Sequence, residues 1–358
     1  MSDLENIRKI KSLCLKELDK GIIASWQSLL DYSSEFEFES QSLYLIKSWY
    51  DSIYNFSFLK DIPLDTEEIF FHSADLTEIL TENGKRRYEH DLTQEDLETV
   101  YKIIALKHNI DWNYKEPFCS FSFKFEKKEI RVSLIHQSLS STKRPKGFFR
   151  FLNNKVIPIE KYEHSKILNA MIESKKNILI SGSTGSGKTT LTNSLLNLIP
   201  KEEHILILED TKELIIRSEN TTSLLSNKKF DQSLDTLLAY GLRISPERVI
   251  LGEMRSKEVT SFLLAMNTGH KGMISTIHAN NAKDTVHRIA LMFMMYGNMN
   301  LSYELVLKLV CQNIDHIVFI ENKKIKEIIN LYGAEGSTIF HDSMIKQDTE
   351  CLQEIQSV

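Results

Sequence analysis

A glycine-rich segment at residues 182–190 has the composition and spacing of a loop that binds phosphate groups. Its first eight residues fit G-x-x-x-x-G-K-[ST], in which backbone N–H groups curl around phosphate oxygens. We expect the Lys188 ammonium to reach the β- and γ-phosphates of ATP and the Thr189 hydroxyl to bind Mg²⁺. A purely structural glycine turn is the alternative. The residues expected at the nucleotide are Gly182, Ser183, Thr184, Gly185, Ser186, Gly187, Lys188, Thr189 and Thr190.

Acidic residues follow two apolar runs that read as strands. One run leads into Glu209 and Asp210, and the other is followed by Gly252 and Glu253. Ligands of open α/β sheets bind beyond the carboxyl ends of the strands, so these acids should face the phosphates. Gly252 stands where a Mg²⁺-binding aspartate is usual, which makes Glu253 the best candidate for the base that activates water; a surface acid is the alternative. Glu209 is a further catalytic candidate, and Asp210 is a candidate Mg²⁺ ligand.

Two histidines flank a third apolar run. His270 precedes the run at 273–277, and His278 follows it directly. By the same geometry of strand ends, His278 should arrive near the nucleotide, which makes it a catalytic candidate. A histidine that only satisfies its own hydrogen bonds at a strand end is an equally weighted alternative.

Short apolar strands alternating with helices must position these side chains. A helix is predicted at Thr189–Leu198, and Pro200 stops it. Such continuous apolar strands predict a mostly parallel sheet buried on both faces, and therefore an α/β fold. A strand pair should follow at 316–320 and 326–331. The four apolar runs of the sheet are 177–180, 205–208, 249–251 and 273–277.

The first half of the chain has a different pattern of apolar and polar residues. Helical periodicity before residue 60 gives way to alternating strands, a hairpin signal at Asn83-Gly84 and a capping box at Thr93–Asp96. This predicts a smaller α+β domain. The predicted divisions are a helical extension at 1–60, an α+β domain at 61–152, a linker at 153–163, an ATPase domain at 164–336 and a polar tail at 337–358.

Composition and charge argue against several classes of function. The 358 residues are 42% hydrophobic and carry a formal net charge of −5, which speaks against general affinity for nucleic acid. The four cysteines are scattered, without metal-ligand spacing, and fit a reducing compartment. Because no apolar run approaches the ~18–20 residues needed to cross a bilayer, we expect a cytoplasmic protein that reaches a membrane only through partners.

Taken together, the motifs resemble those of the type II/IV secretion-system traffic ATPases, over about residues 65–335. The absence of an aspartate before Glu253 is a trait of that family. Arg243, Pro246 and Arg248 are most similar to the branch with type IV secretion and tight-adherence pilus ATPases. The motifs that resemble the family's phosphate loop, aspartate box, second acidic motif and histidine box are Gly182–Thr189, Leu208–Leu214, Leu242–Arg255 and Gly269–Asn280.

The resemblance implies a RecA-like ATPase domain in a hexamer, with ATP bound between it and the amino-terminal domain. Family arginines of the amino-terminal domain touch the phosphates, and Arg131 and Arg150 match them loosely; for Arg131 a solvated sheet face is the alternative. Arg144 is a weaker match. Arg243 and Arg255 are either trans-acting charges at a subunit boundary or local partners of the acids.

The function implied is an ATP-driven motor of a secretion or pilus-assembly machine, working at the inner face of the inner membrane with its membrane components. No specific nucleic acid is expected as a partner. A RecA-like nucleic-acid motor is the alternative from another class, but the acidic balance and the histidine segment speak against it. A regulator that binds nucleotide without turnover is disfavoured by the intact Lys188, Thr189, Glu209 and Glu253.

Overall fold

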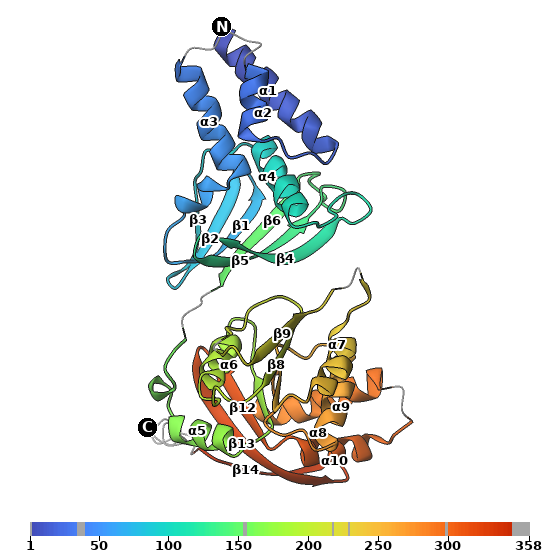
Figure 1. Ribbon diagram of the computed structural model, residues 1–358. Helices are drawn as coiled ribbons and strands as arrows, with labels where there is room; N and C mark the ends of the chain where they lie inside the picture. Colours follow the sequence, from blue (N-terminus) through green and yellow to red (C-terminus); the bar gives the residue numbers. More distant parts are fainter. Residues whose placement is uncertain are drawn as a thin grey trace. The chain divides into compact units, whose positions relative to one another are not determined.

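The structure of the chain, a computed structural model, describes residues 2–33, 40–152, 156–216, 218–227, 230–297 and 300–345. It divides into an amino-terminal unit, Met1–Asn154, and a carboxy-terminal unit, Lys155–Val358 (Figure 1). The first three residues of the predicted linker and the predicted tail from residue 346 onward lie outside the described residues.

The amino-terminal unit contains a six-stranded sheet in the order β3-β2-β1-β6-β5-β4, and every neighbouring pair is antiparallel. The hairpin predicted at Asn83-Gly84 is present, with Thr81 opposite Gly84 and a φ of 105° at Gly84. This is a conformation that glycine adopts without strain. The strands are β1 Thr66–Ser73, β2 Leu76–Thr81, β3 Gly84–Arg87, β4 Phe118–Phe125, β5 Lys128–Ile135 and β6 Lys146–Leu152.

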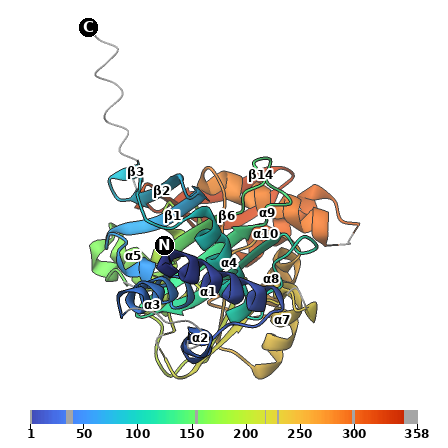
Figure 2. The same ribbon diagram turned by 90° about the horizontal axis from the view of Figure 1, so that it is seen from above.

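Helices cover one face of this sheet, and Figures 1 and 2 show α1, α3 and α4 on the same side of it. The predicted capping box opens α4, where the side chain of Thr93 accepts from the Asp96 backbone. Trp49 on α3 donates to Asp96 at 2.8 Å, and buried residues of α1 and α3 share one core with the strands. The helices are α1 Ser2–Asp19, α2 Trp26–Ser33, α3 Ser40–Tyr54, the 3-10 turn η1 Ser57–Lys60 and α4 Gln94–Lys107.

The carboxy-terminal unit contains an eight-stranded sheet in the order β14-β13-β12-β7-β11-β10-β8-β9. From β12 to β9 all neighbours are parallel, while β13 is antiparallel to both of its neighbours, β12 and β14. The strands are β7 Ile178–Ser181, β8 Ile205–Glu209, β9 Thr221–Leu225, β10 Arg248–Leu251, β11 Ile274–Ile277, β12 His316–Glu321, β13 Lys324–Glu335 and β14 Thr338–Ser343.

Helices lie on both faces of this sheet, which explains why its central strands β7, β10 and β11 are buried along their whole length. One core contains residues of α5 and α6, and the other contains residues of α7 to α10. The helices are η2 Ile159–Lys161, α5 Ser165–Glu173, α6 Lys188–Leu196, α7 Leu234–Gly241, η4 Leu242–Ile244, α8 Glu258–Asn267, α9 Ala282–Tyr296 and α10 Tyr303–Asn313.

Two edge strands differ from the sequence prediction. β9 lies in a polar stretch that carried no strand signal, and β14 lies in the region predicted as a loosely held tail. Ile339 of β14 is buried against the sheet at 7% exposure, but most of the strand is exposed. An edge strand pairs on one side only, so its sequence need not be apolar. In the described ranges no helix is long and apolar enough to span a bilayer.

Candidate active site

The glycine-rich segment connects the carboxyl end of β7 to the amino end of α6. Gly185 and Gly187 have φ values of 74° and 104°, and Gly187 is the residue that caps α6. A Cβ atom on Gly182 would lie 2.2 Å from the carbonyl oxygen of Ile320 on β12, so no larger residue fits there. The loop therefore needs its glycines for backbone conformation and for close contact with the neighbouring strand.

The Lys188 side chain is folded back onto this loop. Its Nζ donates to the carbonyl oxygens of Gly182 at 2.9 Å and Ser183 at 2.7 Å, and lies 3.4 Å from Nδ1 of His278. Burial lowers the pKa of the Lys188 ammonium, while the nearby Glu253 opposes that shift. In the described part of the chain, the buried Ser186 hydroxyl has no hydrogen-bond partner. A buried cation and an unused hydroxyl at a helix amino terminus fit an anionic ligand.

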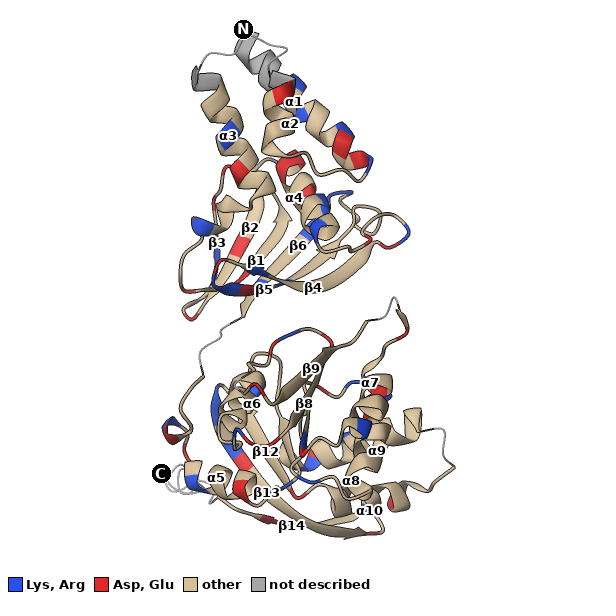
Figure 3. Ribbon diagram, in the orientation of Figure 1, with Lys and Arg blue, Asp and Glu red and all other residues tan. Residues whose placement is uncertain are grey.

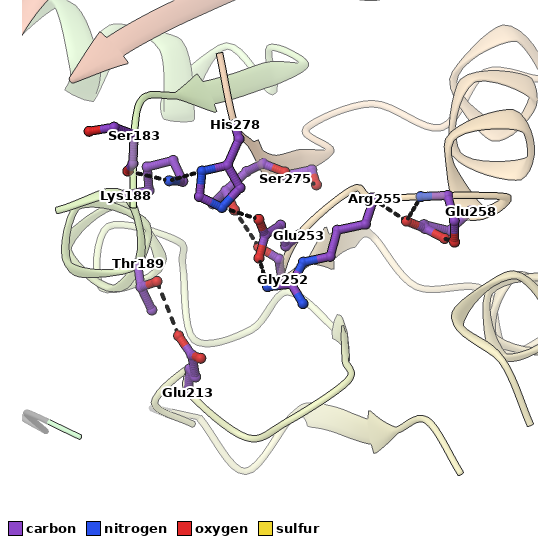
Figure 4. A network of polar contacts seen from close by, with 12 residues as sticks. Ser183, Lys188, Thr189, Glu213, Gly252, Glu253, Arg255, Glu258, Ser275 and His278 are labelled. Atoms are coloured by element: carbon purple, nitrogen blue, oxygen red, sulfur yellow. Dashed lines mark hydrogen bonds and ion pairs between the residues drawn. The ribbon is translucent and has the colours of Figure 1, made fainter. Parts of the chain in front are cut away.

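Thr189 is joined to an acid from the segment after β8. Its hydroxyl donates to Glu213 Oε2 at 3.3 Å (Figure 4). Glu209 holds that segment in place, because its Oε1 accepts from the backbone N–H groups of Glu213 at 2.9 Å and Leu214 at 2.8 Å. A hydroxyl beside a carboxylate is a donor set that suits Mg²⁺.

Glu209 itself is a buried side chain, exposed by only 3%. Burial raises the pKa of its carboxyl to about 7, although the two amide donors oppose the shift. A Cβ atom at Gly252, on the neighbouring strand end, would lie 3.1 Å from Glu209 Cγ. A side chain at position 252 would therefore press against Glu209, which would have to shift by a few tenths of an ångström.

Glu253, the next residue, lies among charged groups. Its Oε1 is 2.7 Å from Nε2 of His278, and its Oε2 accepts from the Arg255 guanidinium. Arg255 is held in turn by Glu258 at the start of α8, which accepts from the Arg255 backbone. Figure 4 shows His278 between Lys188 and Glu253, with Arg255 reaching Glu253 from the other side.

The sequence matches the family described as "Type II/IV secretion system protein" over residues 146–353, more than half of the chain. The chain belongs to this family. The resemblance drawn from the motifs is therefore confirmed, and the match covers the whole of the site just described.

Relatives in the family carry names from type IV secretion and conjugation. The chain is 32% identical to the conjugal transfer protein TrbB of Rhizobium radiobacter over 213 residues, which are 55% of this chain and 64% of TrbB. It is 38% identical to the type IV secretion system protein PtlH of Bordetella pertussis over 163 residues, 44% of this chain and 48% of PtlH. The chain thus spans less than two thirds of the length of these curated relatives.

Among solved structures, the fold is similar to that of the pilus retraction motor PilT with bound ADP. The TM-score is 0.58 at 19% identity, covering 82% of this chain and 83% of PilT. At that identity the likeness concerns the fold alone, an α/β architecture with two sheets.

The family motifs meet at one edge of the parallel sheet, but not all their residues do. Lys188, Thr189, Glu253 and His278 converge. Asp210, expected to face the phosphates, has an exposed carboxylate that accepts from Ser226, just beyond β9, at 2.7 Å, and its charge also helps to raise the pKa of Arg255.

His270, Arg248 and Arg243 also belong to the motifs, and each contacts a neighbouring group of the fold. His270 lies before β11, at the end opposite His278, and its ring contacts the Ala265 carbonyl. Arg248 is buried and bonded to Glu203 at 2.6 Å. Arg243 lies over the ring of Tyr240. Of the two readings for Arg255, its observed partner is an acid of its own chain, Glu253.

Arg131 and Arg150 lie in the amino-terminal unit, directly opposite each other on β5 and β6. Arg150 donates to Glu68 on β1 through Nε at 3.2 Å and Nη2 at 2.9 Å. Arg131 is half-buried on the sheet face that carries Arg150. Figure 3 shows cationic and anionic residues in both units rather than one uniformly basic unit.

Sequence reasoning did not assign Glu213 to the site. The residue was visible in the aspartate box, but its contact with Thr189 depends on how residues 210–214 fold over Glu209. A carboxylate four residues beyond a strand end carries no distinctive signal, so only the folded turn identifies it.

Proposed function

We propose that this chain is a magnesium-dependent ATPase that powers a bacterial secretion or pilus-assembly machine. One observation carries the proposal: Lys188 of the phosphate loop and Glu253 at the end of β10 are bridged by His278, in a family of secretion-system proteins. Phosphate binding and water activation thereby lie within one contact network, as hydrolysis of a terminal phosphate requires.

We assign the residue roles by chemistry. The backbone of residues 182–190 and the Lys188 ammonium bind the phosphates, and Glu253 orients the attacking water. Thr189 and Glu213 would hold Mg²⁺, which supplies charge neutralisation at the phosphates when bound; Glu213 takes the part first expected of Asp210. Glu209 supports the turn that presents Glu213.

The wider setting is also a proposal. The strand order β12-β7-β11-β10-β8-β9 supports a RecA-like ATPase domain that begins near residue 164, after a linker at 153–163, and extends beyond the expected end at 336 to include β14. Arg131 and Arg150 are proposed to contact the nucleotide because they match the family's arginines loosely and lie side by side on one sheet face; Arg150 would then exchange Glu68 for a phosphate. A hexamer that acts at the cytoplasmic face of the inner membrane, with membrane-bound partners of the machine, completes the proposal.

Purified chain should hydrolyse MgATP, and Lys188→Ala should abolish both turnover and tight binding of MgATP. The matched control is Lys201→Ala, an exposed lysine in the turn after α6. Phosphate release and binding of a fluorescent ATP analogue measure the two effects. Unchanged turnover in Lys188→Ala would remove the site assignment.

A further inference from the structure

The Lys188 ammonium has all three of its N–H groups in use. An ammonium offers three donors and no acceptor. Its acceptors are the carbonyl oxygens of Gly182 at 2.9 Å and Ser183 at 2.7 Å, and Nδ1 of His278 at 3.4 Å. A phosphate oxygen can therefore engage Lys188 only if one of these contacts is exchanged. The longest contact, the one to His278, is the one most easily given up.

The partners of His278 define the state of its ring. Because an ammonium can only donate, Nδ1 must be the unprotonated, accepting nitrogen. The proton then sits on Nε2, which lies 2.7 Å from Glu253 Oε1 and is attracted to its negative charge, although Oε1 accepts no aligned hydrogen bond from the described residues. A neutral ring with this single tautomer accepts from Lys188 and turns its N–H side to Glu253, so the position of Lys188 and the position of Glu253 are linked through the ring.

The charges around the ring favour that neutral form. Burial, followed by the charge of Lys188, lowers the pKa of His278; Arg255 and Arg288 act in the same direction, and Glu253 opposes them. These groups come from α6, the β10–α8 segment and α9. Protonation of Nδ1 would place a cation against Lys188, so the bridge exists only while the ring is neutral.

Glu253 is held at both oxygens in this arrangement. His278 contacts Oε1, the Arg255 guanidinium donates to Oε2, and Glu258 anchors Arg255 through its backbone. Each group in contact with a carboxylate oxygen occupies a place where a water molecule oriented by the same oxygen would lie. Release of one donor would free an oxygen for that water.

We propose that His278 is a positioning residue that couples phosphate binding at Lys188 to the release of Glu253. While Lys188 rests on the loop, the ring is fixed at both nitrogens and keeps Glu253 engaged. When Lys188 transfers to a phosphate, Nδ1 loses its donor, the ring is held at one point only, and it can turn away from Glu253. This coupling rests on the proposed ATPase function and specifies how that site is regulated.

A double-mutant cycle tests the coupling. MgATP dissociation constants are measured with a fluorescent analogue for the full chain, for Glu253→Ala, for His278→Ala and for the double variant. Removing the Glu253 charge should tighten MgATP binding in either background. The tightening should be at least about threefold larger when His278 is present, because only then does the loss of Glu253 also loosen Lys188.

His278→Gln is the rescue variant. Its amide oxygen and nitrogen are spaced like the two ring nitrogens, so it can accept from Lys188 and donate to Glu253. In this background the effect of Glu253→Ala should match that in the wild type. His341→Ala, at an exposed histidine of β14, is the control and should leave all constants unchanged.

The outcomes separate the two proposals. If Glu253→Ala changes MgATP affinity by the same factor with and without His278, the coupling is wrong while the ATPase assignment stands. If His278→Gln behaves like His278→Ala, the bridging geometry is wrong. If the wild-type chain binds no MgATP, or Lys188→Ala binds it equally well, the proposed function fails and the coupling fails with it.

Discussion

Glu209 and Glu253 occur at the ends of adjacent parallel strands and yet have opposite surroundings. Leu208 of β8 is in register with Leu251 of β10, so Glu209 lies beside Gly252, and Glu253 is one residue further along. Glu209 is buried and bonded to two backbone amides. The Glu253 side chain is 20% exposed and contacts a histidine and an arginine.

The difference shows that a strand end alone does not define the role of an acid. Glu209 uses one oxygen to hold the turn at 210–214, so its carboxylate acts on the backbone. Glu253 lies one residue further along, where its carboxylate meets the side chains of Arg255 and His278. A single residue of offset along the sheet separates a structural acid from a candidate base.

The largest expected effect is a difference in turnover between Glu253→Gln and Glu209→Gln. Glu253→Gln should lower kcat by at least about 100-fold, because an amide cannot accept a proton from water. Glu209→Gln should lower kcat by less than about tenfold, because the amide oxygen can still accept from the two backbone N–H groups. Steady-state ATPase assays on both variants measure the contrast, and equal losses would contradict the division of roles.

The phosphate loop and the parallel sheet could be predicted because local sequence determines them. Glycine at positions 182, 185 and 187 and continuous apolar strands are requirements of the backbone and of burial on two faces. The convergence of Lys188, Glu253 and His278 follows from strand ends meeting at one edge.

The remaining features depend on tertiary contacts that no local pattern contains. Glu213 reaches Thr189 only because the turn folds onto Glu209. The helices before residue 60 could be recognised from their apolar stripes. A stripe does not show which surface it packs against, and here the stripes pack into one core with the amino-terminal sheet. β14 was missed because an edge strand needs few buried residues.

The dependence of stability on pH should also distinguish Glu209 from Glu253. The raised pKa of Glu209, about 7 against an ordinary 4.5, means that the folded state binds a proton more tightly than the unfolded state. The stabilising contribution of this proton is fully present below pH ~4.5 and is lost as pH rises through ~7.

The free energy of unfolding of the wild type, relative to Glu209→Gln, should therefore fall by about 2 kcal/mol between pH 5.5 and 8. Urea titrations of the two proteins at both pH values measure it, and the other titrating groups cancel in the difference. A relative stability that stays constant between the two pH values would mean that Glu209 is already ionised in the folded protein at pH 5.5.

The smallest effect concerns the space that the two strand ends share. Gly252→Ala places a methyl group 3.1 Å from Glu209 Cγ, so the Glu209 side chain must shift by a few tenths of an ångström. We expect a cost of about 1 kcal/mol in the free energy of unfolding, and a cost close to zero when Glu209 is also alanine. Urea unfolding of the two single variants and the double variant gives the coupling directly. If Gly252→Ala costs the same in both backgrounds, the Glu209 side chain does not exclude an aspartate from position 252, and the missing acid requires another physical reason.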